Sequence, residues 1–352
     1  MSEQNKQAGG VVFDSVTKRY GSFTAVDAVS FTIEPATLVT LLGPSGCGKT
    51  TTLRMVAGLE PATSGRIVIG GQDVTHRSAA ERDVSMVFQS YALFPHMTVL
   101  ENVSYGPQSS GVPRAQAEAM AADKLRMLGL AGLEKRLPSE LSGGQQQRVA
   151  VARSLVLEPA VLLFDEPLSN LDAKLRRRVR QEIRELQQSL ALTVVYVTHD
   201  QSEALAVSDR IIVMEAGRIA QEGSPRQLYG QPASRFLADF IGDANLVDGE
   251  LREGGSLFVA AGVALPVQGP AGRDGPASLA LRPHRLRLAA PGAGRIDGQC
   301  RRVDYLGSHH EVLVDTPWGT LLLFAADDAP MPVPGSGVAV DFDPSVAVVL
   351  PS

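Results

Sequence analysis

The stretch LVTLLGPSGCGKT, residues 38–50, joins an apolar run to a glycine-rich loop of the pattern G-x-x-x-x-G-K-[ST]. The first five residues are typical of a buried strand, and a helical pattern follows Thr50. A strand, a glycine-rich turn and a helix in this order favour phosphate binding, because backbone N–H groups and the helix N-terminus converge on an anion. A glycine-rich helix cap without a ligand is the disfavoured alternative, because both flanking elements are predicted. We expect Lys49 to pair with nucleotide phosphate oxygens and the Thr50 hydroxyl to bind Mg²⁺.

Apolar runs rich in Val, Leu and Ile alternate with helical patterns over the first two thirds of the chain. This alternation predicts an α/β core of parallel strands joined by crossover helices. Three further β-rich segments, residues 11–16, 31–33 and 66–69, predict a mixed β layer beside it. The predicted core strands are 38–42, 84–88, 161–164, 194–198 and 211–214, and the predicted helices are 50–57, 115–128, 145–157, 175–188 and 201–207.

Polar side chains follow three of these strands. Asp165 and Glu166 come after 161–164, Gln89 after 84–88 and His199 after 194–198. Ligands bind beyond the carboxyl ends of parallel strands, so these groups are expected to meet the glycine-rich loop at one edge. Asp165 would hold Mg²⁺ through water and Glu166 would polarise the attacking water. Gln89 would contact the metal or its water, and His199 the γ-phosphate. A single residue of this kind is usually a packing or turn residue, but the convergence favours function.

Residues 141–148, LSGGQQQR, form a second predicted anion-binding device, because a Ser and two Gly directly precede an amphipathic helix. The loop at 43–50 already provides one complete phosphate site. A second site therefore requires either a second nucleotide or a partner chain.

Composition narrows the class of protein. The chain has 352 residues, 44% of them hydrophobic, which suffices for two or more domains with full cores. Its net charge of −5 disfavours nucleic acid as the main partner. The basic run at 174–180 is followed by Glu182 and Glu185 at helical spacing, which favours a solvated helix face over an anion site. Cys47 and Cys300, far apart in the sequence, suggest a reducing compartment.

The two ends of the chain differ from its core. Residues 1–10 have no apolar segment of the secretory type and are expected to be flexible. No run of about 18 apolar residues occurs, so any membrane work would need spanning helices from another polypeptide. After residue 240, short strands at 256–260, 279–282 and 311–315 alternate with Gly and Pro clusters and predict a small all-β barrel. His309 and His310 are adjacent on a predicted strand and point to opposite faces, so a surface strand is favoured over a metal site.

Taken together, these motifs resemble the nucleotide-binding subunits of ATP-binding cassette (ABC) transporters over residues 11–240. The resemblance implies a P-loop α/β domain with a helical subdomain at about residues 90–160. Catalysis would involve Glu166, His199 and Gln89, and Mg²⁺ would be bound by Thr50, Gln89 and Asp165. Tyr20 would stack on adenine, and 169–172, SNLD, is similar to the D-loop. The implied ATP contacts are Tyr20, Gly43, Pro44, Ser45, Gly46, Cys47, Gly48, Lys49, Thr50, Thr51, Ser142, Gly143, Gly144, Gln145 and Asp172.

The same resemblance implies partners and a location. Two chains would form a head-to-tail homodimer with each ATP between one glycine-rich loop and the partner's LSGGQ, which accounts for the second anion site. The segment from Gln89 to His96 would receive a helix of a membrane permease, unless Tyr91 and Phe94 pack against neighbouring helices. The chain would work at the cytoplasmic face of the inner membrane, together with a solute-binding protein.

The C-terminal region, residues 241–352, resembles the TOBE-type barrel of importer ATPases for iron, polyamines, sugars and oxyanions, on the strength of 281–287 and 304–308. His284 stands where Glu is common in these proteins, so no regulatory contact is transferred to it. The chain looks most like ferric iron import subunits, with polyamine import close behind and phosphonate or other solute import as further alternatives. An ABC ATPase without a permease usually has two cassettes or a long coiled-coil insertion, and neither is visible.

Overall fold

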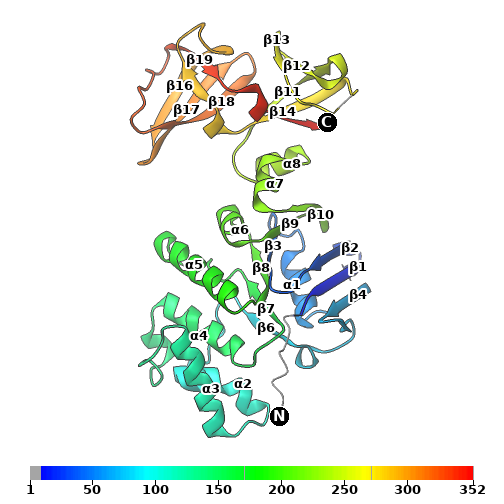
Figure 1. Cartoon of the computed structure of the whole chain (residues 1–352), viewed down its shortest axis with the longest axis vertical. Coiled ribbons are helices and arrows are strands. Elements are labelled where there is room, and N and C mark those ends of the chain that lie inside the picture. Colours follow the sequence, from blue (N-terminus) through cyan, green and yellow to red (C-terminus); the bar gives the residue numbers. More distant parts are fainter. Residues whose placement is uncertain (1–8, 170, 271, 352) are drawn as a thin grey trace. The chain divides into compact units, whose positions relative to one another are not determined.

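The computed structural model describes residues 9–169, 171–270 and 272–351. The segment predicted to be flexible, residues 1–10, lies outside these ranges except for its last two residues, and Asn170 of the SNLD segment lies outside them too. The chain divides into two compact units, the first ending at Pro225 and the second beginning at Arg226 (Figure 1). This division falls before the expected boundary at residue 240, because helix α8 (Arg235–Phe240) packs on strands of the second unit.

A six-stranded sheet forms the centre of the first unit, with strand order β10-β9-β3-β8-β7-β6. All five predicted core strands occur and run parallel, and β10 is antiparallel to β9. Every residue of β3, β7 and β8 is buried, as expected for strands covered on both faces. The bounds are β3 (Leu38–Leu42), β6 (Val84–Val87), β7 (Val161–Asp165), β8 (Thr193–Thr198), β9 (Arg210–Glu215) and β10 (Arg218–Gly223).

Alternate residues of these strands enter two different cores. Val39 and Leu163 pack with α1 (Lys49–Ala57) and with an antiparallel β layer. Leu38 and Leu162 pack on the other face with α4 (Gly143–Leu155) and α5 (Ala173–Ser189). Figure 1 shows α1 between the sheet and the β layer and α5 on the opposite side. The β layer has the order β2-β1-β4-β5, with β1 (Val11–Tyr20), β2 (Phe23–Ile33), β4 (Ser64–Ile69) and β5 (Gln72–Asp73), and α6 (Gln201–Val207) follows β8.

Three helices form the helical subdomain beside β6. These are α2 (Val99–Ser109), α3 (Arg114–Met127) and α4, joined through the short 3₁₀ turn Pro138–Glu140. Thr98 caps α2, because its side chain accepts the Glu101 N–H while the Glu101 carboxylate accepts the Thr98 N–H. The subdomain has its own core, which contains Val103, Leu125 and Val149.

In its described residues, the second unit consists mainly of β-strands, with two short α-helices, α7 (Pro225–Gly230) and α8, and three short 3₁₀ turns. Two antiparallel five-stranded sheets, ordered β13-β12-β11-β14-β20 and β15-β19-β16-β17-β18, share one core around Phe258, Val312 and Trp318. The all-β prediction is confirmed, with two sheets in place of one continuous barrel. The strands are β11 (Asn245–Arg252), β12 (Leu257–Ala260), β13 (Val263–Pro266), β14 (Gly275–Leu281), β15 (Arg287–Ala289), β16 (Ile296–Tyr305), β17 (His309–Thr316), β18 (Gly319–Ala326), β19 (Gly337–Asp341) and β20 (Val348–Pro351).

Arg282 fastens the two short helices to these sheets. Its buried guanidinium donates to the backbone carbonyls of Ala238, Gly242 and Asp243, and a further bond goes to that of Tyr229. The Tyr229 ring also lies 4.2 Å from the Arg282 guanidinium carbon. His284, the residue that departs from the family pattern, places its Nδ1 3.2 Å from the Tyr229 hydroxyl. Burial and the neighbouring arginines lower the pKa of His284, so it is favoured as a neutral packing partner.

Within the described ranges, no helix combines the length and the apolar composition that a membrane span requires.

Candidate functional site

The glycine-rich loop connects β3 to α1 and depends on close backbone packing. A Cβ atom on Gly43 would lie 2.3 Å from the Met214 carbonyl oxygen, and one on Gly48 would lie 2.6 Å from that of Ala25. Gly48 also has a φ of 105°, a region that side chains rarely adopt. The loop therefore needs glycine at these positions, and its backbone is held against β2 and the end of β9.

The Lys49 side chain turns back into the loop. The Lys49 ammonium donates to the carbonyls of Gly43 at 2.7 Å and Pro44 at 2.8 Å, and Lys49 as a whole is only 6% exposed. The Cys47 sulfur lies 3.9 Å from the same nitrogen. Burial raises the pKa of the Cys47 thiol despite the opposing charge of Lys49, which favours an unreactive, protonated thiol. The loop thus keeps a positive charge at its centre.

Thr50 and Asp165 bring two oxygen atoms together beside the loop. The Thr50 hydroxyl lies 3.5 Å from Asp165 Oδ1, which joins the start of α1 to the end of β7. Burial raises the pKa of the Asp165 carboxyl, although the Arg54 charge opposes this. No group of three or more His, Cys, Asp or Glu side chains gathers as a metal site in the described part of the chain. The oxygen pair fits Mg²⁺, which keeps several waters and takes few protein ligands.

Glu166 and His199 are in direct contact. Glu166 Oε2 lies 3.1 Å from His199 Nδ1, so the ends of β7 and β8 are linked through their side chains. The Glu166 backbone has a φ of 45°, and its N–H donates to the carbonyl of Val197. The His199 side chain is 59% exposed, whereas that of Glu166 is 22% exposed. The carboxylate is therefore held in place while the imidazole faces outward.

Gln89 reaches the same cluster through Ser169. The Gln89 amide donates to the Ser169 hydroxyl at 3.1 Å, and that hydroxyl donates to the Glu166 carbonyl at 3.0 Å. The strand order places the loop after β3, His199 after β8, Glu166 after β7 and Gln89 after β6, side by side along one edge. The structure thus brings the predicted strand-end residues together. Ser169 is a link that strand-end reasoning missed.

A buried acidic residue supports this edge and was also missed. The Glu203 carboxylate accepts hydrogen bonds from the Thr198 hydroxyl at 2.8 Å and the Tyr196 hydroxyl at 3.2 Å. Arg176 approaches Glu203 and the Asp200 carboxylate. Glu203, Thr198, Arg176 and Asp200 line a cavity of about 40 Å³ together with Glu166, Ser169 and His199. In the sequence, Glu203 looks like any solvated helix residue. The only signal that could have identified it is its place shortly after Thr198, His199 and Asp200, which end β8 and follow it.

The LSGGQ segment contacts the segment after β7, whereas the loop after β3 packs on β2 and β9. Ser142 caps α4, because its hydroxyl accepts the Gln145 N–H and the Gln145 side chain accepts the Ser142 N–H at 2.9 Å. A Cβ on Gly144 would lie 3.1 Å from a Leu175 methyl group. Asp172 caps α5 by accepting the Leu175 N–H at 2.9 Å. The LSGGQ segment and Asp172 are therefore neighbours, each at the start of a helix.

Tyr20 is the last residue of β1. Its surface is 47% exposed, and the Lys18 ammonium lies 4.8 Å from the centre of its ring.

The segment from Gln89 to His96 differs from its prediction at one residue. Tyr91 is not exposed but buried at 6% exposure, in the core on the α4–α5 face of the sheet. Its backbone and that of Ala92 have positive φ, and Arg153 donates to both carbonyls. Phe94 is half-buried and contacts the exposed Tyr105 ring at 4.9 Å.

The fold and the site define a P-loop ATPase of the mixed α/β class. The ABC transporter family model matches residues 26–169, and the TOBE domain model matches residues 279–350. The chain belongs to the ATP-binding proteins of ABC transporters, because relatives that are 52–61% identical to it cover at least 90% of its length. It is an ATP-binding, ATP-hydrolysing transporter subunit, as the resemblance of its motifs had implied.

Several relatives match nearly the full length of the chain. The Fe(3+) ions import ATP-binding protein FbpC of Agrobacterium fabrum is 61% identical over 320 residues, which cover 90% of each chain. FbpC 1 of Rhizobium meliloti is 59% identical over 95% of this chain and 96% of its own. FbpC of Escherichia coli is 52% identical over 90% of each chain.

Two solved structures resemble about three fifths of the chain. The dimeric structure of MJ0796, a bacterial ABC transporter cassette, is 31% identical with a TM-score of 0.55, and covers 61% of this chain and 99% of its own. A dimeric post-hydrolysis state of MJ0796 bound to ADP and Pi is 32% identical, with the same TM-score and coverage.

Proposed function

We propose that this chain binds and hydrolyses ATP as the energy-supplying subunit of a ferric iron importer. The iron assignment is supported by the relatives that are 52–61% identical over nine tenths of both chains and are named as Fe(3+) import ATP-binding proteins. The observation that carries the ATPase part is the 3.1 Å contact between Glu166 and His199, beside the loop that holds Lys49.

The glycine-rich loop would cradle the ATP phosphates with its backbone N–H groups, and the Lys49 ammonium would leave the loop carbonyls to pair with the β- and γ-phosphates. The exposed Tyr20 ring would stack on adenine. Thr50, Asp165 and Gln89 would hold Mg²⁺, which neutralises charge on the phosphate oxygens when bound.

Hydrolysis would depend on the pair at the ends of β7 and β8. Glu166 would accept a hydrogen bond from the attacking water, and its strained, backbone-anchored position keeps the carboxylate aimed at one place. His199 would hold the γ-phosphate with its exposed ring while its Nδ1 faces Glu166. Gln89 would sense the phosphate and relay its position to Glu166 through Ser169.

The second anion site would act in trans. In a head-to-tail homodimer, Ser142, Gly143, Gly144 and Gln145 of one chain would contact the γ-phosphate bound to the other chain, with Asp172 at the same interface. The dimeric MJ0796 structures support the formation of a dimer, because they show that a related cassette forms one. ATP would then hold two chains together, and hydrolysis would loosen them.

The surface from Gln89 to His96 would receive the permease. Phe88 is 37% exposed and Tyr105 is 45% exposed, so an aromatic surface remains beside Gln89 although Tyr91 is buried. The permease would place the chain at the cytoplasmic face of the inner membrane, and a solute-binding protein would deliver iron on the other side.

One reconstitution tests the proposal. The chain is combined with its own permease and binding protein in vesicles, and uptake of labelled ferric iron is compared with uptake of labelled putrescine and phosphonate. ATP-dependent iron uptake is expected for the wild type and is lost with Glu166→Gln, which should still bind ATP. Uptake of putrescine without uptake of iron would mean that the transported substrate is putrescine and not ferric iron. Failure to recover any permease with the chain from native membranes would instead favour an ABC ATPase outside transport.

A further inference from the structure

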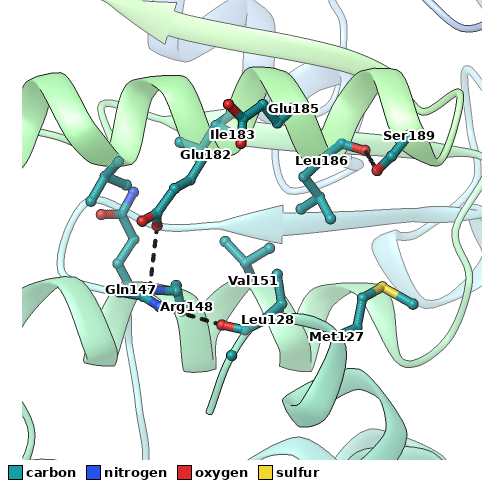
Figure 2. A pocket seen from close by; sticks show the side chains of 12 residues that line it. Met127, Leu128, Gln147, Arg148, Val151, Glu182, Ile183, Glu185, Leu186 and Ser189 are labelled. Atoms are coloured by element: carbon teal, nitrogen blue, oxygen red, sulfur yellow. Dashed lines mark hydrogen bonds and ion pairs between the residues drawn. The ribbon is translucent and has the colours of Figure 1, made fainter.

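A cavity of about 350 Å³ lies between α4 and α5 (Figure 2). Apolar side chains such as Val151 and Leu186 line most of it, and Arg148 pairs with Glu182 at 3.3 Å. This lining selects no particular ligand. The hairpin between β1 and β2 carries a more specific arrangement, because a buried charge there lies against an exposed aromatic ring.

The buried charge belongs to Lys18 on β1, which is only 7% exposed. Its ammonium lies 2.6 Å from Glu60 Oε1 and donates to the Pro61 carbonyl at 2.8 Å. The hydrogen bond from Lys18 lowers the pKa of the Glu60 carboxyl most, and Tyr20 adds a smaller effect, so this partner is ionised at neutral pH. A buried ammonium needs such partners to replace its lost hydration. The same nitrogen lies 4.8 Å from the centre of the Tyr20 ring, within the reach of a cation–π interaction.

The partners of Lys18 lie in the turn that directly follows α1. The backbone of this turn is fixed to the helix, because the N–H groups of Leu59 and Glu60 both donate to the carbonyl of Arg54. The other end of α1 begins at the glycine-rich loop. Lys18 therefore ties the Tyr20 ring to the helix that begins at the phosphate site.

We propose that Lys18, itself held by Glu60, is the residue that positions the Tyr20 ring for the base of the nucleotide. This step rests on the proposed function, in which Tyr20 stacks on adenine. The Lys18 ammonium lies over one face of the ring, so the base is taken up by the other face. The 47% exposure of Tyr20 leaves room for that contact.

The physical effect of Lys18 is to order the ring before the nucleotide binds. Without Lys18, the Tyr20 side chain at the end of the strand would sample several rotamers and would lose that freedom when a base stacks on it. The attraction between ammonium and ring restricts the side chain beforehand, so less conformational entropy is lost on binding. Lys18 is therefore a positioning residue that strengthens binding of the base and leaves the phosphate contacts of the glycine-rich loop unchanged.

Binding of ADP and of pyrophosphate to the full-length protein, each with Mg²⁺ and measured by calorimetry, tests this role. Pyrophosphate carries the phosphate chain of ADP without the ribose and the base, and ADP has no γ-phosphate to be hydrolysed. Lys18→Met should weaken ADP binding about fivefold and change pyrophosphate binding by less than about twofold. A residue that only supported the fold would weaken the binding of both ligands alike.

Tyr20→Ala completes a double-mutant cycle. This substitution should weaken ADP binding at least as much as Lys18→Met does. Adding Lys18→Met to Tyr20→Ala should then change ADP affinity by less than about twofold, because no ring remains to be positioned. Lys18→Gln keeps an amide donor for Glu60 and Pro61 without the charge, so it should fold and weaken ADP selectively even if Lys18→Met does not fold.

Arg66→Met is the matched control. It removes an exposed cation that pairs with Asp14 at 3.8 Å in the same β layer, and it should leave the binding of both ligands unchanged. The positioning role would be overturned by an unchanged ADP affinity in the Lys18 variants, by an equal loss for ADP and pyrophosphate, or by a full further loss in the Tyr20→Ala background. An unchanged ADP affinity in Tyr20→Ala would instead contradict the stacking assigned to Tyr20 in the proposed function, so the two failures are distinguishable.

Discussion

At the scale of single residues, the predicted strand-end side chains meet because parallel strands carry their carboxyl ends to one edge. Each apolar run identified a strand, and the polar residue that follows it, such as Glu166 or His199, then had a predictable place. The buried side chains that support these strand-end residues were not predictable. Glu203 is buried through the docking of α6 on the sheet, and a helix sequence does not show which carboxylate will be covered.

Replacing His199 should separate binding from hydrolysis. His199→Ala removes the imidazole from Glu166 and from the proposed γ-phosphate contact, so turnover should fall about 10²-fold or more. ATP affinity should change little, because the loop and Lys49 remain. Single-turnover hydrolysis and nucleotide binding measure the two effects. His76→Ala, at an exposed histidine, is the control, and an equal fall in both variants would contradict the role.

Glu203 should make stability depend on pH. Burial raises the pKa of its carboxyl above the ordinary 4.5, and the hydrogen bond from Thr198 offsets only part of this. Between 4.5 and the raised value the folded protein binds more protons than the unfolded chain, so this residue's contribution to the free energy of unfolding falls as pH rises. Glu203→Gln lacks this ionisation. Urea unfolding across pH should therefore show the wild type losing stability relative to Glu203→Gln above pH 4.5, and a constant difference would refute the assignment.

At the scale of elements, periodicity located α1, α3, α4, α5 and α6 but not α2, and tertiary contacts decided which side chains the helices leave exposed. Tyr91 follows Gln89 in an aromatic segment and looked like part of a docking surface. The positive φ at Tyr91 and Ala92 instead turns the chain, and Arg153 on α4 holds both carbonyls. Arg153 lies 61 residues after Ala92 and 62 after Tyr91, so nothing local to the segment indicated that Tyr91 would enter the core.

The start of α5 depends on its cap. Asp172→Ala removes the acceptor for the Leu175 N–H and should lower the free energy of unfolding by about 1 kcal/mol. Asp172→Asn keeps a side-chain oxygen and should retain most of that stability. Thermal and urea unfolding of the two variants measure the difference. Equal stability of both variants and the wild type would mean that the cap contributes nothing.

At the scale of the whole molecule, the all-β character of the second unit was predictable from its short strands and Gly-Pro clusters, whereas its boundary was not. Because α7 and α8 are helices, the sequence assigned them to the α/β unit. They belong to the second unit because Arg282, more than forty residues further along the chain, donates hydrogen bonds to their carbonyls. The transported substrate is also poorly encoded, because an ATPase that drives a permease has no need to touch the cargo. The substrate proposal therefore rests on the names of close relatives more than on any side chain.

The assembly itself can be tested by mixing two defective chains. If Ser142 acts on the partner's nucleotide, a dimer of a Lys49→Ala chain and a Ser142→Arg chain has one site built from an intact glycine-rich loop and an intact LSGGQ segment. That dimer should recover up to roughly half of the wild-type turnover, although each homodimer is inactive. In the isolated heterodimer of a wild-type chain and a chain that carries both substitutions, every site has one defect, so this purified heterodimer should be inactive. Recovery in the second combination and none in the first would place Ser142 at its own chain's nucleotide, and the second anion site would then need a different explanation.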